Sequence, residues 1–294
     1  MTLHTTDFPK KAAQMAWEGL RGLDEHKLAL VDTLELLMAP DRLLAWKRSF
    51  HPSGLRLAEV LDRASPLVVL GGDVGCGKTA LATGVGHPLA TRLDKRVRLI
   101  EPPPAIRGTG LVGEMSSNIG ELFRGAVAKV PRGGYGLLLL DEGDDLATSR
   151  EQLQAHHEDR AGVNALIKAI DGLGPGVRLA VILCTNRPDA LDPAIVRRAA
   201  LSLRFGRPRG EALESIVQGL FEGILLKPRE LREFLKRLPT DPPYTPSDLI
   251  HRVGRRALLA AFREERAVTV EDLLAAIEVV EPTPEFGGSA CGDA

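Results

Sequence analysis

A glycine-rich stretch with one lysine is the part of the chain best suited to chemistry. Residues 72–79 read G-D-V-G-C-G-K-T, which is G-x-x-x-x-G-K-[ST], and they follow the apolar run 67–70. Glycine has no Cβ, so the backbone N–H groups of such a loop can turn toward phosphate oxygens. Lys78 supplies a charge for β- and γ-phosphates, and Thr79 supplies a hydroxyl for Mg²⁺. Because the loop follows a predicted strand, a chance glycine-rich turn is the weaker explanation.

A second apolar run ends in two carboxylates. Residues 137–140 have the length of a strand and precede Asp141 and Glu142. Open α/β sheets bind ligands beyond the carboxyl ends of their strands. There Asp141 can hold Mg²⁺ while Glu142 polarises the water that attacks the γ-phosphate; taken alone, the pair could equally cap the next helix. The predicted nucleotide contacts are Gly72, Asp73, Val74, Gly75, Cys76, Gly77, Lys78, Thr79, Ala80 and Asp141, with Thr79 and Asp141 as the Mg²⁺ ligands.

Polar side chains follow the next two elements as well. The apolar run 179–183 leads to Asn186, whose amide can bond the γ-phosphate and the attacking water, or which could simply be a turn residue. The short helix predicted near 191–198 ends in Arg197 and Arg198. Arginines at such an edge can stabilise transition-state charge on a neighbouring subunit's nucleotide. They also suit a helix C-terminus in any protein.

The elements that must position these residues alternate along the chain. Strands are predicted near 67–70, 97–100, 137–140, 179–183 and 201–205, with helical segments between them. This alternation predicts an α/β fold of the P-loop NTPase type, with a parallel sheet sandwiched by helices. Beyond Pro208 the pattern is helical up to residue 280, which predicts a small all-helical lid domain.

In this order the four elements resemble the AAA+ ATPases, and the match runs from about Leu23 to Val280. The strands carry the Walker A, Walker B and sensor-1 positions of that family, and Arg197 and Arg198 fall on its arginine-finger region. The resemblance implies a homo-hexameric ring with ATP at subunit boundaries. It also implies an N-terminal extension over 1–22, a large ATPase domain over 23–207 and a helical lid over 208–280. The prolines and glycines from residue 281 onward, without an apolar period, predict a disordered tail over 281–294.

Two stretches narrow the resemblance to one branch. Residues 110–114 and 119–123 are similar to the pore loop and following helix of AAA+ protein remodellers. Residues 141–150, 160–166 and 170–171 look like the HORMA-domain remodelling ATPases of meiosis and the spindle checkpoint. Bacterial relatives of that branch sit in cyclic-oligonucleotide antiphage systems (CBASS). The resemblance therefore implies a HORMA-domain substrate, possibly bound to a nucleotidyltransferase, and a pore loop at Leu111, Val112 and Gly113.

Some positions depart from the family pattern. Leu111 stands where many remodellers have an aromatic residue, which implies a weaker or differently shaped grip. Ser247 and Asp248 stand where many branches place a sensor-2 arginine; Arg252 and Arg255 could replace it, or they could form a solvated helix face.

Alternative functions within the superfamily are a DNA-acting ATPase of the loader or transposition type, another protein-remodelling chaperone, and a nucleotide-gated scaffold. The apolar pair at 111–112 disfavours the first, and the intact carboxylate of Glu142 disfavours the scaffold.

Composition limits the remaining classes. A net charge of -1 argues against general affinity for nucleic acid, and aromatic residues at 4% offer no base-stacking surface. Arg204, Arg207 and Arg209 lie close in sequence and are expected to form interface pairs or salt bridges. No apolar run approaches the ~20 residues that span a bilayer, so no membrane contact is expected. The cysteines at 76, 184 and 291 lack metal-ligand spacing, which indicates a reducing cytoplasm.

Overall fold

A computed structural model describes residues 1–57, 65–103, 114–143, 157–174, 177–224 and 227–285. The predicted pore loop at Leu111, Val112 and Gly113 lies outside these residues. Among the described helices, none combines the length and apolar character needed to cross a bilayer.

Six strands form one sheet. They are β1 (His4–Phe8), β2 (Leu67–Gly72), β3 (Val97–Glu101), β4 (Tyr135–Leu140), β5 (Leu179–Thr185) and β6 (Leu201–Phe205), in the spatial order β1-β3-β4-β5-β2-β6. The pairs β2–β5, β3–β4 and β4–β5 are parallel. The α/β fold and all five predicted strands are therefore confirmed. Because β5 lies between β2 and β4, the polar residues that follow these three strands emerge at the same edge of the sheet.

The strand β1 was not expected from the sequence. It pairs antiparallel with β3, from His4 opposite Glu101 to Phe8 opposite Val97. Only Phe8 of this strand is buried. The strand therefore shows almost no alternation of apolar and polar residues, which is the pattern that predicts a strand from sequence. Phe8 packs against Gly86, where a Cβ atom would clash with the ring. Part of the predicted N-terminal extension is thus an edge strand of the sheet.

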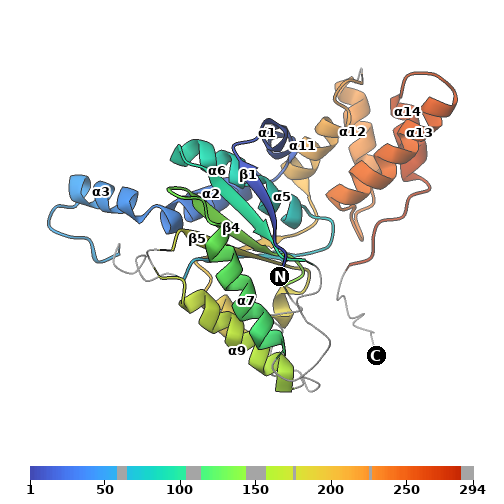
Figure 1. The fold of residues 1–294 in the computed structure, drawn as a ribbon. Helices are drawn as coiled ribbons and strands as arrows, with labels where there is room; N and C mark the ends of the chain where they lie inside the picture. The colour runs from blue at the N-terminus through green and yellow to red at the C-terminus, as the bar shows by residue number, and fades with distance from the viewer. Residues whose placement is uncertain (58–64, 104–113, 144–156, 175–176, 225–226, 286–294) are drawn as a thin grey trace, which may run out of the picture. The chain divides into compact units, whose positions relative to one another are not determined.

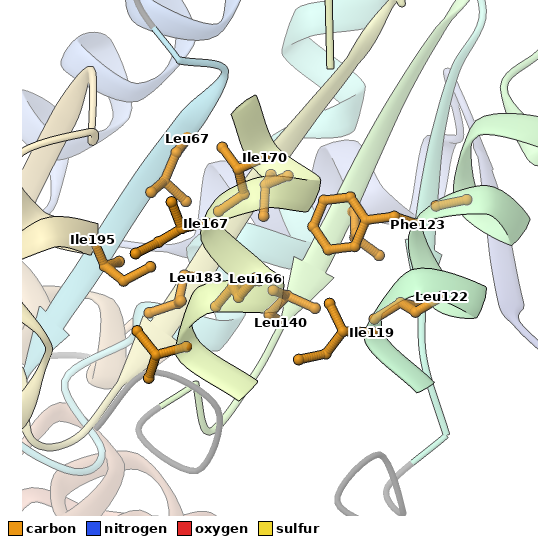
Figure 2. Close-up of a cluster of buried hydrophobic side chains, with 14 of the residues drawn as sticks. Leu67, Ile119, Leu122, Phe123, Leu140, Leu166, Ile167, Ile170, Leu183 and Ile195 are labelled. Carbon is orange, nitrogen blue, oxygen red and sulfur yellow. The ribbon is translucent and has the colours of Figure 1, made fainter. Parts of the chain in front are cut away.

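Helices cover both faces of the sheet (Figure 1). On one face lie α7 (Glu114–Lys129) and α9 (His157–Asp171), and on the other lie α2 (Asp24–Met38), α5 (Lys78–Gly84) and α6 (Gly86–Leu93). Figure 2 shows the first interface, in which side chains of β2, β4 and β5 meet those of α7 and α9. The other helices among the described residues of this part are α1 (Lys11–Gly19), α3 (Pro40–Phe50), the 3₁₀ turn η1 (Pro188–Ala190) and α10 (Pro193–Val196). Burial on both faces explains why the central strands are continuously apolar.

The chain after β6 is helical, as predicted. It contains α11 (Gly210–Leu220), α12 (Pro228–Arg237), the π-helix η2 (Asp248–Gly254), α13 (Arg255–Arg263) and α14 (Val270–Ile277). These helices enclose a core of their own, in which the rings of Phe221 and Phe234 meet edge to face with centroids 5.1 Å apart. Thr283 is hydrogen-bonded to Asp248, two residues beyond the point where the tail is predicted to begin.

The contacts divide the chain into two compact units. The large unit comprises Met1–Trp17, Glu25–Gly71 and Thr79–Arg204. The small unit comprises Glu18–Asp24, Gly72–Lys78 and Phe205–Ala294. The phosphate loop thus groups with the helical lid, although it is far from the lid in sequence.

Candidate nucleotide site

The candidate residues fall into two groups, one in each compact unit. The small unit holds the loop Gly72–Lys78 together with the segments that fasten it. The large unit holds Thr79 and the residues that follow β4 and β5.

The glycines of the loop are required by its geometry. Gly72, Gly75 and Gly77 all have positive φ angles, of 143°, 73° and 95°. A Cβ on Gly75 would lie 2.9 Å from the Cβ of Ser247, and one on Gly72 would clash with the carbonyl of Phe205. Glycine is therefore required at these positions, as it is in loops whose backbone approaches a phosphate closely.

The ammonium group of Lys78 is held inside the loop. Its Nζ donates to the carbonyl oxygens of Gly72, at 2.9 Å, and of Asp73, at 2.6 Å. The residue is 6% exposed. The positive charge therefore lies against the phosphate loop, where it can attract an anionic ligand.

Three contacts within the small unit fasten the loop. The backbone N–H of Asp73 donates to the carbonyl of Phe205 (2.9 Å), and its carboxylate binds Arg207 (Nε–Oδ2, 2.6 Å). The N–H of Ser247, at the start of the lid helix, donates to the carbonyl of Gly75 (3.1 Å). Arg207 was expected to form an interface pair or a salt bridge, and its partner was not predicted. The acidic residue in the phosphate loop was the signal that could have identified that partner.

The thiol of Cys76 is buried in the same loop. Burial, assisted by the nearby carboxylate of Asp73, raises the pKa of Cys76 to about 11. Its Sγ lies 3.8 Å from the carbonyl of Val74. At neutral pH this side chain is a protonated, small apolar group.

The predicted Mg²⁺ ligands meet in the large unit. Thr79 Oγ1 donates to the carboxylate of Asp141, at 3.0 Å from Oδ2 and 3.2 Å from Oδ1, although 62 residues separate the two. Thr79 is in the first turn of α5, and Asp141 follows β4. A hydroxyl and a carboxylate are oxygen donors of the kind that Mg²⁺ binds, so the residues present fit that ion.

Glu142 lies on a sharp turn at the end of β4. Its φ is 53°, in a region that residues other than glycine seldom occupy, and its side chain is exposed. The turn is held by the N–H of Gly143, which donates to the carbonyl of Cys184 at 2.7 Å. A Cβ on Gly143 would lie 2.5 Å from Leu183 Cγ, so only glycine fits there. Backbone strain of this kind is concentrated at functional sites.

Asn186 follows β5 directly and is half-buried. The turn after it is fixed by Thr185, whose Oγ1 accepts the N–H of Arg187 at 2.9 Å. Since β5 is the neighbour of both β2 and β4, Asn186 leaves the sheet beside the strand that carries Asp141 and Glu142.

The two arginines after α10 differ in their surroundings. Arg198 is bound within its own unit: its Nε lies 3.0 Å from Asp171 Oδ1, and its Nη1 donates to the carbonyl of Ala194 at 3.1 Å. Arg197 is exposed. The arrangement leaves Arg197 better placed to reach another molecule.

The sensor-2 region contains a buried carboxylate where other branches carry arginine. Asp248 is 1% exposed and accepts from Arg252 Nη1 at 2.9 Å and from Thr283 Oγ1 at 2.6 Å. Asp248 and Thr245 also exchange hydrogen bonds, each backbone N–H donating to the other's side chain, which is a capping box. In this structure Arg252 therefore forms an ion pair within the lid.

Comparisons with known proteins agree with this geometry. The AAA family, described as ATPases associated with various cellular activities, matches residues 68–207. CD-NTase-associated protein 6 of Escherichia coli (strain MS 115-1) is 39% identical over 293 residues, covering 95% of this chain and 94% of that protein. The chain belongs to this family of AAA ATPases. Membership confirms the resemblance predicted from the sequence, and the protein is an ATPase that binds nucleotide.

Solved structures match over the same extent. A chain in the E. coli MS115-1 HORMA:CdnC:Trip13 complex superposes with a TM-score of 0.88 at 39% identity, covering 96% of each chain. The Rhizobiales Trip13 structure gives a TM-score of 0.74 at 32% identity, covering 96% of this chain and 98% of that one. The likeness therefore extends through the helical lid as well as the sheet.

Proposed function

We propose that this protein is a cytoplasmic, ring-forming ATPase that remodels a HORMA-domain protein in a CBASS-type antiphage system, where the HORMA protein is bound to a nucleotidyltransferase. The observation that carries the proposal is the end-to-end similarity, at 39% identity and a TM-score of 0.88, to a chain solved in a HORMA:CdnC:Trip13 complex. Similarity confined to the ATPase core would support only the chemistry. Here it covers 96% of both chains, the helical lid included.

The ATP site is assigned from the two residue groups. Lys78 and the loop backbone would hold the phosphates, and Asn186 would sense the γ-phosphate. Thr79 and Asp141 would hold Mg²⁺, which when bound neutralises charge on the phosphates. Glu142 is the general base that orients and deprotonates the attacking water, and its exposed carboxylate at a strained turn supports that role.

Assembly supplies the last part of the site. In a homo-hexameric ring one subunit would donate an arginine to the nucleotide of the next. The ion pair of Arg198 with Asp171 favours Arg197 as that residue. Hydrolysis would then release the contacts that hold the neighbour, and the resulting motion would pull on the substrate through Leu111, Val112 and Gly113.

The test is reconstitution with the HORMA-domain protein encoded nearest to this gene, alone and bound to its nucleotidyltransferase. We expect ATP to dissociate the complex, seen as a shift in size-exclusion chromatography, with phosphate release stimulated by the HORMA protein. Glu142→Gln should retain ATP binding but lose hydrolysis by on the order of 10²-fold or more, because general-base catalysis contributes at least that much.

The competing outcomes are distinct. Comparable turnover by wild type and Glu142→Gln would refute the base assignment. Stimulation by single-stranded DNA but not by the HORMA protein would favour a DNA-acting ATPase.

Leu111→Ala should spare basal hydrolysis and abolish dissociation of the complex; unchanged dissociation would place the substrate contact elsewhere.

A further inference from the structure

A buried ion pair joins the phosphate loop to the segment after β6. The side chain of Arg207 is 4% exposed and that of Asp73 is 16% exposed, and Nε and Oδ2 are 2.6 Å apart. Asp73 is the second residue of the loop, next to the carbonyl oxygens that hold Lys78. Its carbonyl accepts from Lys78 Nζ while its carboxylate accepts from Arg207. A single residue therefore contacts both cations and is one of the two loop residues whose carbonyls hold the lysine ammonium.

The same guanidinium reaches the lid. Arg207 Nη1 donates to the carbonyl of Pro243 at 2.7 Å. Four residues later, the N–H of Ser247 bonds the carbonyl of Gly75. The segment that opens the lid helix is thus attached to the phosphate loop at two points, through Arg207 at the start of the loop and directly at its middle. All of these residues belong to the small unit.

A contribution to folding stability does not by itself explain the ion pair between Arg207 and Asp73. Among the described residues, Arg207 Nη2 is a buried donor that lacks a hydrogen-bond partner. Buried polar groups are nearly always paired, and a buried ion pair can often be replaced by neutral groups without loss of stability. An incompletely satisfied arginine at this place suggests that its position serves the loop.

We infer that Arg207 is a positioning residue for nucleotide binding, which holds Asp73, and through it Lys78, in register with the segment that opens the lid. This inference rests on the proposed ATP site. Without the pair, the loop and the lid segment lose one of their two attachments, so nucleotide affinity falls while the hydrolytic group Glu142 is untouched. The expected signature is a rise in KM and in the Kd for Mg·ATP with a small change in kcat.

The central test compares Arg207→Met with the double variant Asp73→Asn/Arg207→Met. The single variant leaves an unpaired carboxylate, so it should lose both thermal stability and nucleotide affinity. The double variant removes both charges at nearly constant volume and should regain stability. We expect its KM to remain raised by on the order of tenfold, which corresponds to ~1.4 kcal/mol. A double variant with wild-type Tm and wild-type KM would overturn the inference, because the pair would then be structural only.

A more exposed ion pair in the lid provides a control, because the side chain of Arg266 is 38% exposed and that of Arg207 is 4% exposed. Arg266 and Asp272 form a bidentate pair with both N–O distances at 2.6 Å, within the same unit but without contact to the phosphate loop. Arg266→Met/Asp272→Asn should change Tm and leave KM for ATP unchanged. If it raises KM as much as the double variant at Arg207 does, the effect comes from lid stability and the inference fails. Arg207→Lys, which keeps the charge but replaces the planar guanidinium fork with a single ammonium group, should rescue KM only in part.

Lys78→Ala separates this inference from the proposed function. If wild type binds Mg·ATP and Lys78→Ala does not, the site is as proposed, and the Arg207 variants decide the inference. If wild type binds no nucleotide in the same titration, the proposed function itself fails.

Discussion

Cys76 shows how a reactive residue type can be made inert by its surroundings. It lies in the phosphate loop, where modification would block a nucleotide. Its thiol is buried, and the pKa of Cys76 is raised to about 11. Thiolate is the form that reacts with electrophiles, so at pH 8 only about one molecule in 10³ carries it.

We therefore expect native Cys76 to resist iodoacetamide at pH 8 and to react only as the pH approaches 11 or after unfolding in guanidinium. Peptide mapping by mass spectrometry gives the extent of labelling at each cysteine. Cys184, also buried, serves as the comparison within the same sample. Rapid labelling of Cys76 in folded protein at pH 8, suppressed by ATP, would contradict this expectation.

The two arginines after α10 should respond differently to truncation. Arg197→Ala removes an exposed side chain, so the free energy of unfolding should stay constant while ATP hydrolysis in the assembled ring falls by on the order of 10³-fold, the effect typical of a trans arginine. Arg198→Ala breaks a half-exposed pair with Asp171 and should destabilise the subunit by up to about 1 kcal/mol.

Urea unfolding and phosphate release measured on both variants distinguish the roles. Asp171→Asn provides the control, because it should reproduce the stability effect of Arg198→Ala. The assignment is reversed if Arg198→Ala abolishes hydrolysis at unchanged stability while Arg197→Ala is active.

At the scale of elements, the lid depends on one buried carboxylate. Asp248 begins the π-helix η2 and ties it to the chain after α14 through Thr283. Burial tends to raise the pKa of Asp248, but hydrogen bonds from Thr283 and Arg252 and from the N–H of Thr245 outweigh it and lower the pKa to about 2. Tyr244 adds a second contact, between the segment before η2 and the end of α14: its hydroxyl donates to the carbonyl of Ile277 at 3.2 Å.

This arrangement predicts acid sensitivity of the lid. The carboxyl pKa of Asp248 is lower in the folded state than its ordinary value of 3.8, so its stabilising contribution is complete above about pH 5 and is lost as the pH falls toward 2. Asp248→Ala should cost roughly 3 kcal/mol at pH 7, because it leaves buried donors unpaired. Thermal denaturation between pH 2 and 7 checks this: the difference between wild type and variant should shrink toward low pH. A constant difference would contradict it.

At the scale of the whole molecule, the nucleotide should control assembly. A site completed by a neighbour's arginine binds ATP more tightly in the ring than in the monomer, so by linkage ATP favours the ring. We expect mass photometry of Glu142→Gln with Mg·ATP to show hexamers, and Lys78→Ala to remain in smaller species under the same conditions. A protein that is monomeric in saturating ATP would contradict the proposed ring.

The sequence alone determined those features that depend on neighbouring residues. The glycine pattern of 72–79, the strand-length apolar runs and the polar residues that end them are local, because backbone freedom and burial periodicity are read within a few positions. They were enough to predict five of the six strands, the helical lid, the family, and the pairing of Thr79 with Asp141 as a candidate ion site.

Tertiary structure decided the contacts between residues far apart in the chain. The place of β5 between β2 and β4, the edge strand β1, and the pairs of Arg198 with Asp171 and Arg207 with Asp73 have no local signature. A charged residue carries no mark of its partner in sequence. Which carboxylate it meets depends on how the elements pack, because a salt bridge contributes at most about 1 kcal/mol at the surface and cannot by itself decide how the chain folds.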